Sequence, residues 1–210
     1  MKLLLLGATG LVGSRTLNLA LSNEVFSEVI APTRKPLAPN NRLVNPVTSR
    51  LEELAPVLMS HKPDAVLCAL GTTQAKAGSK EAFRYVDYEL PLAFGRAAHT
   101  AGVETYALVT AMGASLKSMS FYYRTKGEVE RDIEKIGFQS LTICRPSLIA
   151  GERKETRAAE GAALTLLRVL APILPKKFHV NPADAIAAKL VDAVIAANLG
   201  CRWIYAEEMN

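Results

Sequence analysis

The sequence is poor in the residues that build cross-linked, metal-binding or membrane-spanning proteins. Its three cysteines, Cys68, Cys144 and Cys201, are far apart and include no Cys-x-x-Cys pair, which excludes a disulfide framework and a zinc knuckle. No apolar run approaches the roughly 20 residues that cross a bilayer, and the leucine run at 3–6 ends at Gly7, too soon for a secretory signal. The three histidines show no metal-ligand spacing. We therefore expect a soluble, metal-free protein with reduced thiols, located in the cytoplasm.

Positive charge is in modest excess and is scattered along the chain. The chain carries 25 Lys and Arg against 20 Asp and Glu, a net charge of +5, and its local basic clusters are Arg34–Lys35 and Lys176–Lys177. No basic run with interleaved aromatic residues is present, which argues against nucleic-acid binding. We expect a small-molecule substrate and no nucleic-acid or membrane partner, and leave a protein partner open.

Repeats, linkers and low-complexity segments are also missing, and half of the residues are hydrophobic. Residues 1–210 are therefore expected to form one domain. Apolar segments of strand length alternate with segments of helical periodicity, a pattern that indicates a doubly wound parallel α/β sheet. The expected strands are residues 3–6, 28–31, 41–47, 64–70, 104–110, 140–144 and 202–205, and the expected helices are residues 11–21, 51–59, 80–101 (broken or kinked at Pro91), 121–136, 158–170 and 183–197.

A glycine-rich turn joins the first expected strand to the first expected helix. Glycines recur at Gly7, Gly10 and Gly13, a Gly-x-x-Gly-x-x-Gly spacing. Such a turn lets the backbone approach a pyrophosphate, which lies at the positive end of the helix dipole. We therefore expect a dinucleotide to bind at this turn, through Gly7, Thr9, Gly10, Leu11, Val12 and Gly13.

The end of the second expected strand specifies which dinucleotide. In a βαβ dinucleotide site this position meets the adenosine ribose, where an acidic residue would favour NAD(H) and repel a 2′-phosphate. The segment Thr33-Arg34-Lys35-Pro36 has no acidic residue there. The fork-shaped, permanently charged guanidinium of Arg34 suits a phosphate, and Lys35 adds charge. The cofactor is therefore predicted to be NADP(H).

A Tyr-x-x-x-Lys pair on the expected helix 121–136 suggests what the cofactor is used for. Tyr122 and Lys126 are four residues apart and share one helix face. A neighbouring ammonium lowers the pKa of a phenol, so Tyr122 could exchange a proton with a carbonyl or alcohol while hydride is transferred. A hydroxyl from Thr110, at the end of the preceding strand, or alternatively from Ser115, could hold the substrate oxygen.

Together these segments resemble the atypical branch of the short-chain dehydrogenase/reductase superfamily. The likeness rests on the glycine turn, Arg34, Tyr122-x-x-x-Lys126 and Arg145-Pro146-Ser147. The stretches 68–78, 83–87 and 126–130 are similar to the small Tat-interacting-protein-like oxidoreductases of that branch. The resemblance implies a Rossmann domain that binds NADP(H), with Leu70 and Gly71 near the adenosine side and Pro146 and Ser147 near the nicotinamide. The chain departs from the extended relatives that act on nucleotide sugars, because the short part after Pro146 is expected to form only a small substrate-side lid, residues 147–200, which disfavours a sugar-nucleotide epimerase.

Two functions remain open at this point. The first is an oxidoreductase of the short-chain dehydrogenase/reductase type that acts on a small carbonyl or alcohol, with Tyr122, Lys126 and Thr110 as the catalytic residues. The second is a non-catalytic, redox-responsive module that holds NADPH and regulates a partner. Asp87, which lies within the expected helix 80–101, is open to two interpretations, a residue that lines the site or a solvated helix charge, and the second is preferred.

Overall fold

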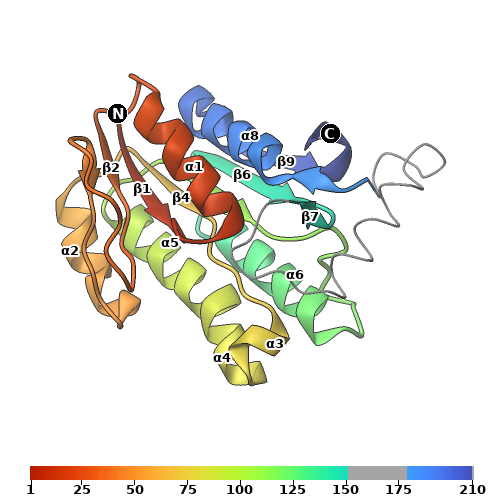
Figure 1. Ribbon diagram of the computed structural model, residues 1–210. Coiled ribbons are helices and arrows are strands. Elements are labelled where there is room, and N and C mark those ends of the chain that lie inside the picture. Colours follow the sequence, from red (N-terminus) through yellow and green to blue (C-terminus); the bar gives the residue numbers. More distant parts are fainter. Residues whose placement is uncertain (151–178, 210) are drawn as a thin grey trace.

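The computed structural model describes residues 1–150 and 179–209, which form a parallel sheet covered by helices on both faces (Figure 1). The strands are β1 (Lys2–Leu6), β2 (Glu28–Ile30), β3 (Leu43–Val44), β4 (Ala65–Cys68), β5 (Thr105–Val109), β6 (Ser140–Arg145), β7 (Ile149–Ala150), β8 (Asn181–Pro182) and β9 (Gly200–Tyr205). The α-helices are α1 (Leu11–Ser22), α2 (Ala55–Ser60), α3 (Gln74–Ala77), α4 (Lys80–Arg84), α5 (Leu90–Thr100), α6 (Phe121–Glu134) and α8 (Ala183–Ala196). Shorter helical turns are η1 (Leu51–Leu54), η2 (Tyr85–Glu89) and η4 (Ala206–Met209).

The main sheet has the strand order β3-β2-β1-β4-β5-β6-β9, and every pairing in it is parallel. The order reverses between β1 and β4, and in such sheets ligands bind in the crevice at the carboxyl ends of the strands on either side of the reversal. The predicted doubly wound α/β fold is confirmed.

The leucine run of β1 shows why the sheet forms two layers of core. Leu3 and Leu5 point into one hydrophobic cluster, whereas Leu4 and Leu6 point into the other. The first cluster lies under α1 and α8, and the second lies under α2, α5 and α6 (Figure 1). Because both faces are covered, a continuous apolar strand is stable here where an alternating one would bury polar groups.

Two predicted segments differ from the observed elements. The segment predicted as one helix over residues 80–101 consists of α4, a π-helical turn and α5, because Pro91 has no N–H and Leu90 instead donates to the Tyr85 carbonyl five residues back. The segment after β4, for which no helix was predicted, contains α3, which is capped by the Thr73 hydroxyl and ends at Gly78 with a positive φ of 80°.

The described C-terminal segment belongs to the main layers. Helix α8 packs beside α1 against the sheet, and β9 extends the sheet next to β6, as predicted. The helix predicted over residues 158–170, the Lys176–Lys177 cluster and most of the predicted lid lie outside the described residues. None of the helices within the described ranges is long and apolar enough to span a bilayer.

Candidate functional site

The glycine turn is fixed by close backbone contacts. Gly7 has a φ of +85°, and a Cβ placed on it would lie 2.6 Å from the carbonyl oxygen of Ala69, at the end of β4. A Cβ on Gly13 would lie 2.0 Å from the carbonyl oxygen of Gly7. These two positions therefore admit only glycine, and Gly7 lies against the backbone of Leu70.

The start of α1 is shaped to receive an anion. Gly10 is the N-cap residue; neither a capping side chain nor an acidic residue occupies the first turn. The first N–H groups of a helix have no partner within the helix, and they carry the positive end of its dipole. Gly10 and Thr9 are exposed, while Val12 and Gly13 are buried. The exposed, uncapped N-terminus is thus suited to the pyrophosphate of a dinucleotide.

Arg34 and Lys35 lie on an exposed turn that follows β2. Asn45 holds this turn, since its side-chain amide donates to the Thr33 hydroxyl (2.8 Å) and its carbonyl oxygen accepts from the Leu37 N–H (2.8 Å). Within residues 1–150 and 179–209, Arg34 makes no ion pair or side-chain hydrogen bond, so its guanidinium is available to a ligand. Sequence reasoning did not identify Asn45 as the residue that positions Arg34.

Lys126 is a buried charged group at the carboxyl edge of the sheet. Its ammonium lies 2.7 Å from Oδ1 of Asp87, and their side chains are 5% and 0% exposed. The second oxygen of Asp87 accepts a hydrogen bond from the Thr72 N–H (2.9 Å), and Gly71 covers the pair. The structure therefore brings together Gly71 and Lys126 and adds Asp87 between them.

Tyr122 lies one helical turn before Lys126, half-buried against the ring of Phe83 at a centroid distance of 5.5 Å. Burial raises the pKa of Tyr122, the Lys126 charge opposes that effect, and Asp87 adds to it. Its pKa is raised overall, so the expected lowering is wrong. Burial alone would lower the pKa of Lys126, but Asp87 and Tyr122 together outweigh burial and raise it.

The hydroxyl of Thr110 is used in a different network. It donates to Oε1 of buried Glu130 (2.6 Å), whose carboxylate is also bound by the Arg145 guanidinium. The alternative residue, Ser115, is exposed, and its backbone packs against Gly127 of α6. Among the described residues, no hydrogen bond joins Thr110 to the Tyr122–Lys126 pair, and its catalytic role stays a prediction.

Pro146 and Ser147 lie at the carboxyl end of β6, where the resemblance places the nicotinamide. The Ser147 N–H donates to Oδ1 of fully buried Asn181 (2.8 Å), and the Asn181 amide donates to the Ala206 carbonyl (2.8 Å). The Pro146 carbonyl accepts from the Met112 N–H (2.7 Å). This turn is therefore held by both the β5 loop and the C-terminal segment.

Asp87 is the residue that the sequence interpretation placed wrongly. It is 1% exposed rather than solvated, and it lies within the π-helical turn η2. A signal was present in the sequence, because Asp87 lies four residues after Phe83 and three before Leu90, both of which are buried. That spacing places it on the buried face of the helix.

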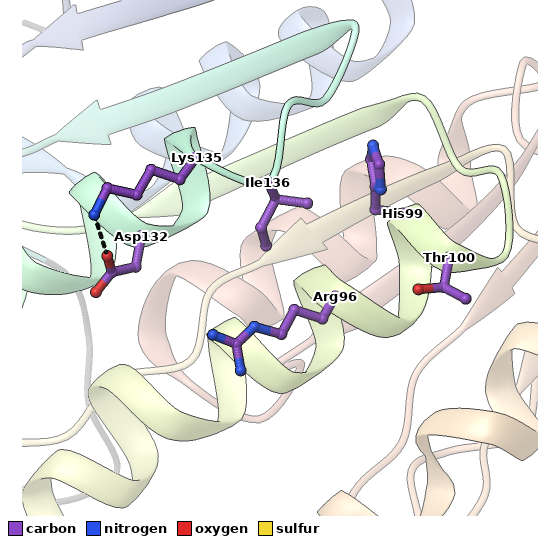
Figure 2. Close-up of a pocket in the computed structure, with 6 residues that line it drawn as sticks. All are labelled: Arg96, His99, Thr100, Asp132, Lys135 and Ile136. Atoms are coloured by element: carbon purple, nitrogen blue, oxygen red, sulfur yellow. Dashed lines mark hydrogen bonds and ion pairs between the residues drawn. The ribbon is translucent and has the colours of Figure 1, made fainter.

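A hollow with a volume of about 310 Å³ lies between α5 and α6, away from the candidate site (Figure 2). A neighbouring hollow shares His99 and is lined by residues just before β5 and β6. Both therefore lie at the amino edge of the sheet, opposite the glycine turn, and contribute nothing to the candidate site. The first is lined by Arg96, His99, Thr100, Asp132, Lys135 and Ile136.

Sequence comparison identifies the family. A family model described as HIM1 matches residues 21–174. The chain belongs to the HIM1 family. Its relatives include the protein fmp52, mitochondrial, of Aspergillus fumigatus, which is 36% identical over 206 residues, 92% of this chain and 86% of that protein. The Candida albicans protein FMP52, mitochondrial, is 37% identical over 161 residues, covering 74% of this chain and 70% of that protein.

Solved structures show that this HIM1-family protein has a Rossmann-like fold. The Bordetella bronchiseptica enzyme WbmH, solved with NAD+, superposes with a TM-score of 0.74 at 15% identity, over 98% of this chain and 75% of that chain. UDP-glucose 4-epimerase of Thermotoga maritima gives 0.70 at 17% identity, over 91% and 72% of the two chains. At such identities the likeness shows the fold and not the reaction.

The relatives' names contradict the cytoplasmic location expected from the sequence. Three of the fungal FMP52 proteins, from two Aspergillus-type fungi and Candida albicans, are named mitochondrial. The expectation rested on scattered cysteines and on the lack of a secretory or membrane-spanning segment. Those features do not distinguish the cytoplasm from the interior of a mitochondrion, because proteins that reside there need no secretory or membrane-spanning segment either.

Proposed function

We propose that this HIM1-family protein is an NADP(H)-dependent oxidoreductase of the short-chain dehydrogenase/reductase type, acting on a small carbonyl or alcohol. One observation carries the proposal: at the carboxyl edge of the sheet lie an uncapped glycine turn, an Arg34 guanidinium without a partner among the described residues, and the helix pair of half-buried Tyr122 and buried Lys126. The resemblance to the small Tat-interacting-protein-like oxidoreductases supports the same reading.

Each part of the site has a distinct task in this proposal. The glycine turn would hold the pyrophosphate, Arg34 and Lys35 the 2′-phosphate, Leu70 and Gly71 the adenosine side, and Pro146 and Ser147 the nicotinamide side. The bound nicotinamide supplies hydride to the substrate carbon. Tyr122 supplies a proton to the substrate oxygen, and Lys126 orients the groups beside it.

The test combines binding with turnover. NADPH and NADH affinities would be measured by calorimetry, and NADPH consumption would be followed over a panel of small aldehydes and ketones. We expect tighter binding of NADPH than of NADH, and turnover that falls by about 100-fold or more in Tyr122→Phe, since general acid catalysis contributes about that much. Turnover that persists in Tyr122→Phe would remove Tyr122 from the mechanism.

A non-catalytic NADPH-binding module is the second candidate. The engagement of the Thr110 hydroxyl by Glu130 favours it, because that hydroxyl is already used within the fold and is not directed at a substrate oxygen. Tight NADPH binding without turnover of any substrate in the panel would support this candidate over the first.

A further inference from the structure

The ammonium of Lys126 is matched by a carboxylate from a separate helical segment. Asp87 approaches it to 2.7 Å with a fully buried side chain, and the Thr72 N–H holds the other carboxylate oxygen. A Cβ on Gly71 would lie 3.6 Å from Asp87 Oδ1 and 3.8 Å from Lys126 Nζ, so this backbone forms one wall around the pair. Water is therefore largely kept from both charges.

The segment that carries Asp87 is fastened to α6 on both sides of that residue. Arg84 is ion-paired with Glu128, and the Tyr88 hydroxyl donates to Asp132 Oδ2 (3.0 Å). Asp87 lies between these anchors, in the π-helical turn η2. Interruptions of this kind re-aim side chains and are frequent at functional sites. The ion pair is thus one of three contacts that hold η2 against the helix bearing Tyr122.

We propose that Asp87 is a positioning residue that neutralises Lys126 beside Tyr122, and that the site is thereby built for carbonyl reduction rather than alcohol oxidation. This inference rests on the proposed oxidoreductase function. It assigns a direction to the reaction and a role to a carboxylate that the Tyr-x-x-x-Lys pattern does not include.

The charges around Tyr122 explain the direction. The groups that act on its phenol are Lys126 and Tyr123 from its own helix and Asp87 from η2. Beneath the ion pair, burial raises the pKa of Cys68, on β4, to about 11, which leaves a neutral thiol. The ammonium and carboxylate cancel, so burial dominates and Tyr122 retains its proton.

Because Tyr122 keeps its proton, reduction of a carbonyl is favoured over oxidation of an alcohol. In reduction, Tyr122 would give its proton to the substrate oxygen as that oxygen takes up the carbonyl π electrons, a bound NADPH would supply the hydride for the new C–H bond, and solvent would reprotonate the tyrosinate. The products are an alcohol and oxidised NADP. In oxidation Tyr122 must lose its proton first, which the neutralised pair does not assist.

The test measures the ionisation of Tyr122 directly. Ultraviolet absorbance of tyrosinate is titrated in wild type and in Asp87→Asn, each against its own Tyr122→Phe partner, so that the difference isolates Tyr122. We expect the midpoint to fall by about 1 pH unit or more in Asp87→Asn, because an uncompensated ammonium favours the phenolate. Near neutral pH, the ratio of kcat for oxidation to kcat for reduction, each measured at saturating substrate, should rise about 10-fold. An unchanged midpoint would overturn the proposal.

Two further variants keep the result interpretable. Asp184→Asn, an exposed carboxylate on α8, removes the same charge elsewhere and is expected to leave the midpoint unchanged. The second control measures the effect of Asp87→Asn on the Tyr122 midpoint in the absence of Lys126, by comparing Lys126→Met with Asp87→Asn/Lys126→Met. This pair also covers the case in which Asp87→Asn alone does not fold. If the midpoint shift caused by Asp87→Asn is equally large without Lys126, Asp87 does not act through Lys126 and the proposal fails.

The titration needs neither substrate nor turnover, so the two proposals fail separately. A protein that shows the shift but consumes no NADPH supports the role of Asp87 in setting Tyr122 and overturns the oxidoreductase assignment. A protein that is active but shows no shift overturns the role of Asp87 and leaves the oxidoreductase assignment intact.

Discussion

The two ends of the candidate site are held by different kinds of contact. At the glycine turn, backbone meets backbone: Gly7 lies against Ala69, and Gly13 lies against Gly7. At the Tyr122–Lys126 end, the fixed points are side chains, and the central one is a buried ion pair with Asp87. The first end should respond to any added atom and hardly to pH, whereas the second should respond to charge.

The largest expected effect is at the backbone-defined end. Gly7→Ala places a Cβ 2.6 Å from the Ala69 carbonyl oxygen at a φ of +85°, so we expect a loss of about 4 kcal/mol in the free energy of unfolding from strain and overpacking. Gly137→Ala is the matched control, with the same φ of +85° and nothing within 4 Å of the added Cβ. It should cost only about 1–2 kcal/mol. Equal losses in urea unfolding would show that packing against β4 is unimportant.

The next effect is at the charge-defined end. Lys126→Met leaves Asp87 buried without a counter-charge, and we expect a loss of about 3 kcal/mol in urea unfolding. Asp87→Asn/Lys126→Met should recover most of that loss, because neither charge remains. Since the folded-state pKa of Lys126 is raised above 10.5, the wild-type advantage should be complete below that pH and decline as the pH rises through the raised value. A double variant as unstable as Lys126→Met would contradict the ion-pair account.

A smaller effect separates the cofactors at the glycine-turn end. Arg34→Ala should weaken NADPH binding about 10- to 100-fold, or about 1.4–2.7 kcal/mol, and leave NADH binding unchanged, because only NADPH carries the 2′-phosphate. Arg96→Ala, an exposed arginine at the opposite edge of the sheet, is the control (Figure 2). Calorimetric titration with both cofactors measures the difference. Equal affinity of the wild type for NADH and NADPH would defeat the assignment of Arg34.

The smallest effect on stability is expected at the ion pair between Asp132 and Arg131, which is more exposed than the buried pair of Asp87 and Lys126. Hydrogen bonding to Arg131 is the largest cause that lowers the pKa of Asp132, to about 2 against an ordinary 3.8. Asp132→Asn should therefore cost about 0.5–1 kcal/mol at neutral pH, an effect present above pH 3.8 and lost as the pH falls through about 2. Urea unfolding along an acid series tests this, and a difference that persists at the lowest pH would point to packing instead.

The backbone-defined end was the more predictable from sequence. Glycine spacing reports local conformation, and the apolar run before Gly7 identifies a strand covered on both faces, so the turn and the parallel sheet followed directly. Arg34 was placed correctly at the end of β2 because proline and strand length define that point. Its support by Asn45 was not predicted, since that contact spans two strands.

The charge-defined end depended on information that local sequence does not carry. The pKa of Tyr122 is set by how deeply its ring is buried and by Asp87, which comes from another helical segment. A regular helix over residues 80–101 was predicted, and the π turn before Pro91 changes which residues face α6. The partner of Thr110, Glu130, likewise becomes apparent only when β5 and α6 are packed together.

The side chain of Asn181 connects the last residues of the fold with the turn at Ser147. It accepts from the Ser147 N–H and donates to the Ala206 carbonyl. Deleting or re-routing the end of the chain would therefore remove a brace from the predicted nicotinamide side without touching a ligand. A reporter or affinity tag fused there would act on that brace, so its effect on the proposed cofactor site has to be measured before such a fusion is used.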